Sequence, residues 1–144
     1  MKNQNFENHA RFVPGYHFVT STLLLLGTIG ASINLWKQIA RGENVYNASL
    51  ILLLFIIGIF LFYFIRTFAV TVQDRAIRAE ENLRHYIITG KPIDPRITLG
   101  QIIALRFASD DELVELSNKA ISESLASVEI KKLIKNWKAD HHRA

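Results

Sequence analysis

Two long apolar runs constrain the fold of this 144-residue chain more than any other feature. They extend from Phe18 to Trp36 and from Ala48 to Ile65, and neither holds an acidic or basic side chain. About 20 apolar residues in a helix, at a rise of about 1.5 Å per residue, cross the roughly 30 Å hydrocarbon layer of a membrane. Aromatic residues that favour the membrane interface flank both runs: Tyr16, Trp36, Tyr46 and Tyr63. The runs therefore predict two transmembrane helices, over about residues 17–36 and 46–66.

The basic residues near the ends of the runs predict how the chain is oriented. One group lies on the side that holds both termini, and a smaller group lies in the short connection between the runs. The first group is Lys2, Arg11, Arg66, Arg75, Arg78 and Arg84, and the second is Lys37 and Arg41. Because cytoplasmic segments carry the excess of lysine and arginine, both termini are predicted to be cytoplasmic. A signal peptide is the alternative for the first run, since Gly30, Ala31 and Ser32 imitate a cleavage site; the transmembrane interpretation is preferred.

The second run continues into a charged helix. No proline interrupts residues 45–89 and Gly58 is the only glycine there, so one helix is predicted from near Val45 to near Thr89. Beyond the apolar run, its apolar residues recur at alternating steps of three and four, as in a coiled coil. This heptad seam consists of Ala69, Val72, Ala76, Ala79, Leu83 and Tyr86. The seam needs a partner, which is either a second chain or the helices that follow in the same chain.

The rest of the chain carries signals for short helices. Gly90 suits the position after a helix, and Pro92 and Pro95 keep that helix from resuming. Two capping boxes then begin new helices: Thr98 with Gln101, and Ser109 with Glu112. A last helix is expected from about Val128 to Asp140. The predicted fold is all-α, with a transmembrane hairpin in residues 1–69 whose second helix extends into a cytoplasmic helical bundle in residues 70–144.

Small and polar residues form a stripe on the first apolar run: Thr20, Gly27, Ala31 and Asn34. Small residues let helices approach closely in lipid, and Gly27 and Ala31 have the small-xxx-small spacing. We expect helix packing or an oligomer interface along this stripe and along the heptad seam, chiefly at Val72, Ala76, Ala79 and Leu83. Packing within one chain is the alternative for both surfaces.

The sequence carries no signature of catalysis. It has no cysteine, and its histidines (His9, His17, His85, His141 and His142) lack the spacing of a metal site. Neither a nucleophile elbow nor a phosphate-binding glycine loop is present. Asp110, Asp111 and Glu112 are interpreted as favourable charges at a helix start, with Asp110 as the partner of Arg106. We therefore expect no enzyme activity, no cofactor and no metal.

Lysines gather near the end of the chain, on the predicted last helix: Lys131, Lys132, Lys135 and Lys138. Each lysine near an anionic membrane surface contributes about 1 kcal/mol of attraction, so we expect contact with anionic lipid. Nucleic acid is a weaker alternative, because Trp137 is expected on the apolar face of that helix rather than free to stack on a base.

Four segments carry a family resemblance: "NFENHARFVPGYH", "QDRAIRAEENLRHY", "QIIALRFASDDEL" and "IKNWKADHHRA". Over essentially its whole length the chain resembles an uncharacterised family, a domain of unknown function, of short two-span bacterial membrane proteins. The resemblance implies a location in the bacterial inner membrane and assigns no residue a role. Some members carry a transporter permease label, but two spans without a substrate-sized polar cavity give that label little physical support.

The function predicted from the sequence is assembly rather than chemistry. We expect an inner-membrane interaction component, either a homo-oligomeric scaffold or an accessory subunit of a larger membrane complex, with membrane lipids as its other partner. The alternative is a small oligomeric channel or transporter component lined by the stripe of Thr20 and Asn34. A pore needs a polar lining, and Asn34 is the only strongly polar side chain in either apolar run.

Overall fold

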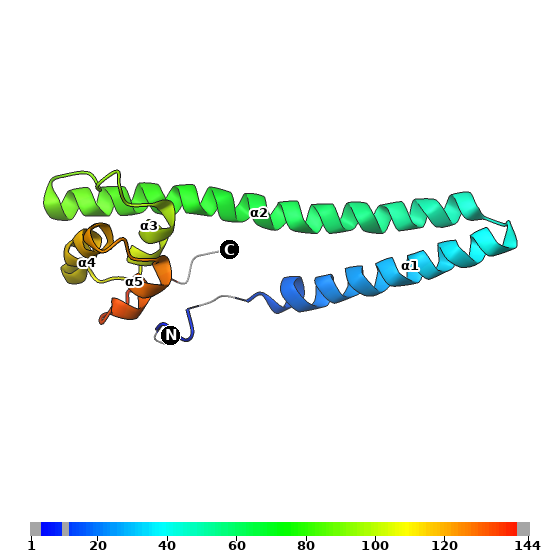
Figure 1. The fold of residues 1–144 in the computed structure, drawn as a ribbon, viewed down its shortest axis with the longest axis horizontal. Helices are drawn as coiled ribbons and strands as arrows, with labels where there is room; N and C mark the ends of the chain where they lie inside the picture. The colour runs from blue at the N-terminus through cyan, green and yellow to red at the C-terminus, as the bar shows by residue number, and fades with distance from the viewer. Residues whose placement is uncertain (1–3, 10–11, 141–144) are drawn as a thin grey trace. The chain divides into compact units, whose positions relative to one another are not determined.

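The described part of the chain, residues 4–9 and 12–140 of a computed structural model, is all-helical (Figure 1). In chain order the elements are a short π-helix η1 (Gly15–Thr20), α1 (Ser21–Arg41), α2 (Val45–Thr89), α3 (Leu99–Leu105), α4 (Asp110–Ser122) and α5 (Ser127–Leu133). These residues contain no β-strand, and one isolated bridge joins Ala108 to Trp137. The predicted all-α fold class is confirmed, as is the single uninterrupted helix from Val45 to Thr89.

The chain forms two compact units. One unit holds residues 12–68, and the other combines the N-terminal segment with the residues from Ala69 onward. Helix α2 contributes its first half to the first unit and its second half to the other. The N-terminal segment clusters with the helical part that begins at Ala69, not with residues 12–68, which follow it directly in the sequence.

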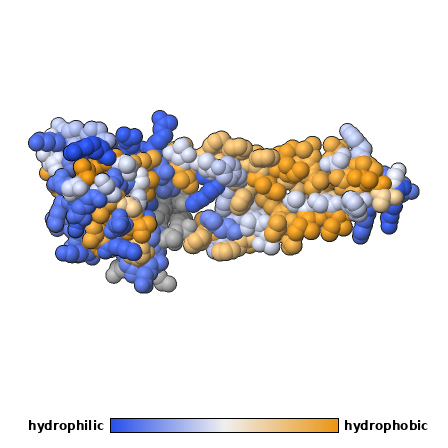
Figure 2. Space-filling model, viewed as in Figure 1, coloured by the Kyte–Doolittle hydropathy of each residue, from blue (hydrophilic) through white to orange (hydrophobic). Residues whose placement is uncertain are grey.

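The first unit is a helical hairpin in which α1 lies beside the first half of α2 (Figure 1). The turn between them uses left-handed backbone at Gly42 and Asn44, with φ of 69° and 51°. The Gly42 N–H donates to the carbonyls of Gln38 and Ile39, which closes α1 as the sequence predicts. Apolar residues cover the face of this unit shown in Figure 2. Helices η1 and α1 together, and α2, are each long and apolar enough to span a membrane.

The second unit has its own hydrophobic core. Its largest fully buried side chains come from α3, α4, α5 and the residue pair after α3: Ile102, Leu105, Phe107, Leu113 and Ile130. Ile77 of α2 joins this core, which ties the long helix to the short ones. Helix α3 is buried on several sides, as its nearly uniform apolar sequence predicts. The predicted Thr98 and Gln101 capping box is present in both directions.

The last helix is shorter than predicted. Helix α5 ends at Leu133, and the chain then runs extended so that Trp137 bridges Ala108. The Ser109 N–H donates to the Asn136 carbonyl at 3.1 Å, and the Lys138 N–H donates to the Phe107 carbonyl at 2.8 Å. These bonds to a distant segment replace the bonds that a longer helix would make within itself.

The predicted capping box of Ser109 with Glu112 is wrong, again because of hydrogen bonds to the extended segment after α5. Ser109 does precede α4, but its hydroxyl makes no capping hydrogen bond. The Glu112 carboxylate instead accepts the N–H groups of Lys135 and Asn136, at 3.1 and 3.2 Å. Glu112 thus holds the extended segment against the start of α4.

The N-terminal segment docks on this unit in a way that the sequence did not predict. The Gln4 side chain exchanges two hydrogen bonds with the backbone of Asp140, at 2.7 and 3.1 Å. The His9 ring lies 5.9 Å from the Phe107 ring and 5.8 Å from the Trp137 ring, measured between centroids. Lys131 Nζ is 3.2 Å from His9 Nε2. An ammonium only donates, so Nε2 accepts and His9 Nδ1 donates to the Phe6 carbonyl at 2.7 Å.

Candidate functional site

The heptad seam on α2 is exposed along its whole length. Val72 is 67% exposed, Leu83 60% and Tyr86 55%, and Ala69, Ala76 and Ala79 are exposed as well. The short helices cover a different face of α2, where Ile77 and Glu81 retain 6% and 7% exposure. Among the described residues, the chain therefore leaves its most regular apolar face uncovered.

Two oppositely charged residues flank the seam. Arg75 and Glu80 are both exposed and lie on opposite sides of the line from Val72 to Leu83. Neither takes part in an ion pair within the described part of the chain. The steps of three and four place the apolar residues of the seam on one side of α2, between these two charges.

The small-residue stripe of α1 packs within the chain at Gly27 and Ala31, but not at Thr20. Ala31 is buried, Gly27 and Asn34 are half-buried, and Thr20 is exposed. A Cβ built on Gly27 would lie 2.0 Å from Cε1 of Phe55 in α2. The absence of a side chain at Gly27 therefore leaves room for the Phe55 ring between the two helices of the hairpin. Thr20 lies away from this contact, and its hydroxyl donates to the Gly15 carbonyl at 2.9 Å.

The four lysines do not form one helical stripe. Lys131 and Lys132 lie on α5, whereas Lys135 and Lys138 lie on the extended segment after it. Lys131 is half-buried over the Phe107 ring, 5.8 Å from its centroid, and Lys132 Nζ lies 5.7 Å from the Phe6 centroid. Three of the four are exposed to any partner, and Lys131 belongs to the contact with the N-terminal segment.

An arginine on α2 connects the long helix to the short ones. Arg84 Nε donates to Asp110 at 2.6 Å, and its two terminal nitrogens reach Glu81 at 3.0 Å and the Ala108 carbonyl at 2.7 Å. The hydrogen bond and charge of Arg84 lower the pKa of Asp110. Because the side chains of Arg84 and Glu81 are largely buried, this cluster holds the unit together rather than facing a ligand.

Arg106 has a different partner from the one predicted. Its guanidinium is buried and lies 3.4 Å from the Asp140 carboxylate, while Asp110 is taken by Arg84. Its carbon Cζ lies 4.7 Å from the Phe107 ring centroid. Burial lowers the pKa of Arg106, and the charge of Asp140 opposes that shift. Its Nε and Nη1 lack hydrogen-bond partners, so the ion pair with Asp140 is its main compensation among the described residues.

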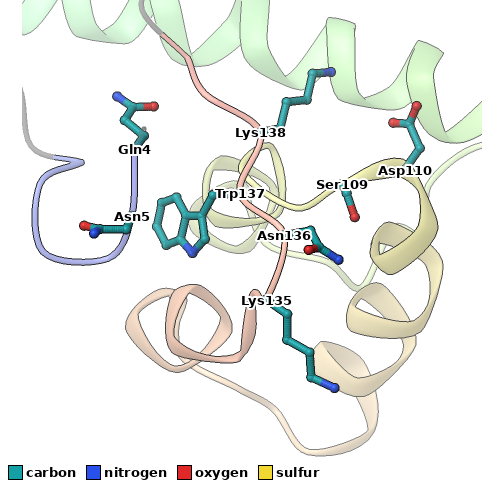
Figure 3. A pocket seen from close by; sticks show the side chains of 8 residues that line it. All are labelled: Gln4, Asn5, Ser109, Asp110, Lys135, Asn136, Trp137 and Lys138. Carbon is teal, nitrogen blue, oxygen red and sulfur yellow. The ribbon is translucent and has the colours of Figure 1, made fainter. Parts of the chain in front are cut away.

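A polar depression of about 610 Å³ lies between the N-terminal segment, the start of α4 and the extended segment (Figure 3). It is lined by Gln4, Asn5, Ser109, Asp110, Lys135, Asn136, Trp137 and Lys138. The Ser109 hydroxyl is buried here and has no hydrogen-bond partner among the described residues, because the Glu112 backbone N–H, which would pair with it in a capping box, donates to the Ser109 carbonyl at 3.2 Å. This lining contains no histidine that would activate the hydroxyl as a nucleophile.

Metal-ligating side chains do not gather in the described residues, where no group of three or more His, Cys, Asp or Glu could hold an ion. His141 and His142 lie outside the described residues, as do Lys2 and Arg11, two of the basic residues from which the orientation was predicted.

The docking of the N-terminal segment is the contact that was not predicted from the sequence. The sequence feature that could have indicated this contact is the pair Phe6 and His9, two ring side chains in a segment that was interpreted only as the lead into the first apolar run.

These features define an all-helical protein with two helices long and apolar enough to cross a membrane, and with an uncovered heptad seam on the second of them. The chain belongs to a family of unknown function, DUF6526, whose model matches residues 1–144. Comparison with curated proteins and with solved structures found no match. This match confirms the predicted membership of a family of unknown function over the whole chain, and it supplies no activity.

Proposed function

We propose that this chain is an integral protein of the bacterial inner membrane that acts as an assembly component. Residues of α1 and of the first half of α2 span the bilayer, and both termini lie in the cytoplasm. The exposed heptad seam recruits the partner that completes the complex, whether a homo-oligomeric scaffold or a larger assembly. No catalytic step is assigned to it.

The observation that carries this proposal is the exposed apolar face of α2 beyond residue 68. A helix face in water with Val72, Leu83 and Tyr86 each more than half exposed costs free energy until another surface covers it. The apolar surfaces of α1 and of the first half of α2 have lipid as their natural solvent, but the seam lies among charged residues such as Arg75 and Glu80. It therefore needs a protein partner.

The mass of the intact complex tests the proposal. Extraction from the membrane in mild detergent, followed by native mass spectrometry, should give a species that contains more than one polypeptide. A strictly monomeric species at every detergent concentration, together with the absence of cross-linked partners in native membranes, would overturn the assembly function. Recovery of the chain in the soluble fraction would overturn the membrane location.

The predicted orientation has its own test, because the chain contains no cysteine. Single cysteines introduced at Glu43, in the hairpin turn, and at Glu123, after α4, should react with a membrane-impermeant maleimide from opposite sides of the inner membrane. Equal labelling from one side would contradict a two-span topology with cytoplasmic termini.

The channel alternative gains no support from the polar side chains of α1. The hydroxyls of Thr28 and Ser32 donate to carbonyls of their own helix, at 2.7 and 2.8 Å. Asn34 accepts a bond from Gln38 at 3.4 Å. Planar-bilayer recording of the purified complex separates the two functions, because an assembly component should be electrically silent.

A further inference from the structure

We infer that the partner of the heptad seam is a second copy of this chain, paired in parallel and in register as a short two-stranded coiled coil. This inference rests on the proposed membrane assembly function and names its partner. It concerns residues 69–86 of α2, all within the unit that also holds α3, α4 and α5.

The seam has the spacing of coiled-coil core positions. Ala69, Ala76 and Leu83 are seven residues apart and take the a position, and Val72, Ala79 and Tyr86 take the d position. The short helices do not obstruct this face, because they pack around Ile77 and Glu81 on the other side of α2. A second helix can therefore approach the seam without displacing the core of the unit.

The flanking charges select the partner and its direction. In this register Arg75 is at a g position and Glu80 at the following e position, which are the positions that face each other across a parallel pair. Each Arg75 would then meet Glu80 of the second copy, and the symmetry of the pair makes that contact twice. An antiparallel pair brings g to g and e to e, so it cannot join Arg75 to Glu80.

The proposed membrane topology independently favours a parallel arrangement of the two helices. Every copy of the chain crosses the bilayer with one topology, so the second halves of two α2 helices leave the membrane side by side and pointing the same way. The seam covers 18 residues, from Ala69 to Tyr86, which is about two and a half heptads and so fewer than the three to four that usually sustain a coiled coil. Tethering of two copies in one membrane raises their effective concentration and makes so short a seam sufficient.

Cysteine cross-linking of the full chain in native membranes tests this pairing, since the chain has no cysteine of its own. Ala76→Cys and Ala79→Cys, each as a single variant, should form disulfide-linked dimers with high yield, because the same core residue of two parallel in-register helices lies within disulfide reach. Arg78→Cys is the matched control, because Arg78 is exposed on the same stretch but lies off the seam. Equal yields at Arg78 and at the seam would mean random collision and would overturn the inference.

Charge reversal tests the direction and register in the Ala79→Cys background. Arg75→Glu and Glu80→Arg should each lower the dimer yield, by roughly fivefold, because two facing pairs become repulsive at once. The two changes together should restore the yield, since they exchange the ends of the same pair. Failure of the double reversal to restore cross-linking would overturn the parallel register.

The outcomes also separate this inference from the proposed function. A complex with more than one polypeptide but no self-cross-link at Ala76 or Ala79 would leave the assembly function standing and exclude a second copy on the seam. A monomeric mass together with absent cross-links would overturn both. A monomeric mass in detergent with strong, seam-specific cross-links in membranes would support the pairing and show that it needs the bilayer.

Discussion

Gly27 of α1 lies so close to Phe55 of α2 that any side chain at position 27 would occupy the space of the aromatic ring. A Cβ there would be 2.0 Å from Phe55 Cε1 and 2.4 Å from its Cζ. The contact joins the two helices of one hairpin, which is one of the two roles that the sequence left open for this glycine. Gly30, on the same helix, has nothing within 4 Å of its Cβ position.

Gly27→Leu should therefore damage the hairpin itself. The larger side chain must displace Phe55, and overpacking of this kind costs about 1–3 kcal/mol. We expect a lower melting temperature in detergent and less protein inserted in the membrane. Gly30→Leu is the control, and it should change neither by a comparable amount. Similar losses from both variants would show that the close approach to Phe55 is not the cause.

Arg84→Met should loosen α2 from the short helices. The change removes three donors and leaves the Glu81 carboxylate, whose side chain is 9% exposed, without its cationic partner. Breaking a buried pair on one side costs about 3 kcal/mol. Hydrogen exchange at the α4 amides should become faster, whereas Arg78→Met, at an exposed position, should shift stability by no more than about 0.5 kcal/mol.

The double variant Arg84→Met/Glu81→Gln checks the physical cause of that loss. Replacing the carboxylate with an amide removes the uncompensated charge, so the double variant should be more stable than Arg84→Met alone. If the double variant is less stable, the loss comes from packing of the arginine stem instead.

The elements that the sequence predicted well are those whose signals are local. The bounds of α2 follow from helix-forming residues with no proline between Val45 and Thr89, and the Thr98 and Gln101 capping box involves residues three apart. The apolar face of the seam also follows from periodicity, but its exposure does not, because the sequence left open whether the helices that follow in the same chain cover it. In each case the bonding partners lie within one turn of the same helix.

The parts that the sequence predicted wrongly depend on distant partners. Glu112 fits a capping box locally, but it binds the backbone of Lys135 and Asn136 instead. Arg106 has Asp110 one turn away and pairs with Asp140. Trp137 satisfies helical periodicity, yet it reaches the core from an extended segment. In each case the partner is determined by tertiary packing. A sequence pattern that repeats every three or four residues carries no information about such distant partners.

The loop between α2 and α3 provides a prediction about pH. Arg96 donates to the Asp94 carboxylate from its backbone N–H and from its guanidinium, and the side-chain bonds are the larger cause of a pKa lowered to about 2. Because the folded pKa lies below the ordinary 3.8, the stabilisation from this pair is present above pH 3.8 and is lost as the pH falls through about 2.

Arg96→Gln should raise the pKa of Asp94 without returning it to the ordinary value, because the backbone N–H of residue 96 still donates at 2.9 Å. A carbon-13 NMR titration of the Asp94 carboxyl group measures this shift. Arg75→Gln, which removes a charge from α2, should leave the Asp94 titration unchanged. A pKa that stays near 2 in Arg96→Gln would show that the guanidinium is not the cause.

The four lysines near the C-terminus should respond to anionic lipid in two different ways. Lys132, Lys135 and Lys138 are exposed, so each is expected to contribute about 1 kcal/mol of attraction to an anionic surface. Lys131 is held by His9 and Phe107, so its loss should release the N-terminal segment instead.

The full chain in nanodiscs of zwitterionic or anionic lipid distinguishes these roles by hydrogen exchange. Anionic lipid should slow exchange over residues 131–138, and high salt or the triple change of the exposed lysines to Gln should abolish that effect. Lys131→Gln should accelerate exchange in residues 4–9 in either lipid; protection that is the same in both lipids would show that the exposed lysines serve only solubility.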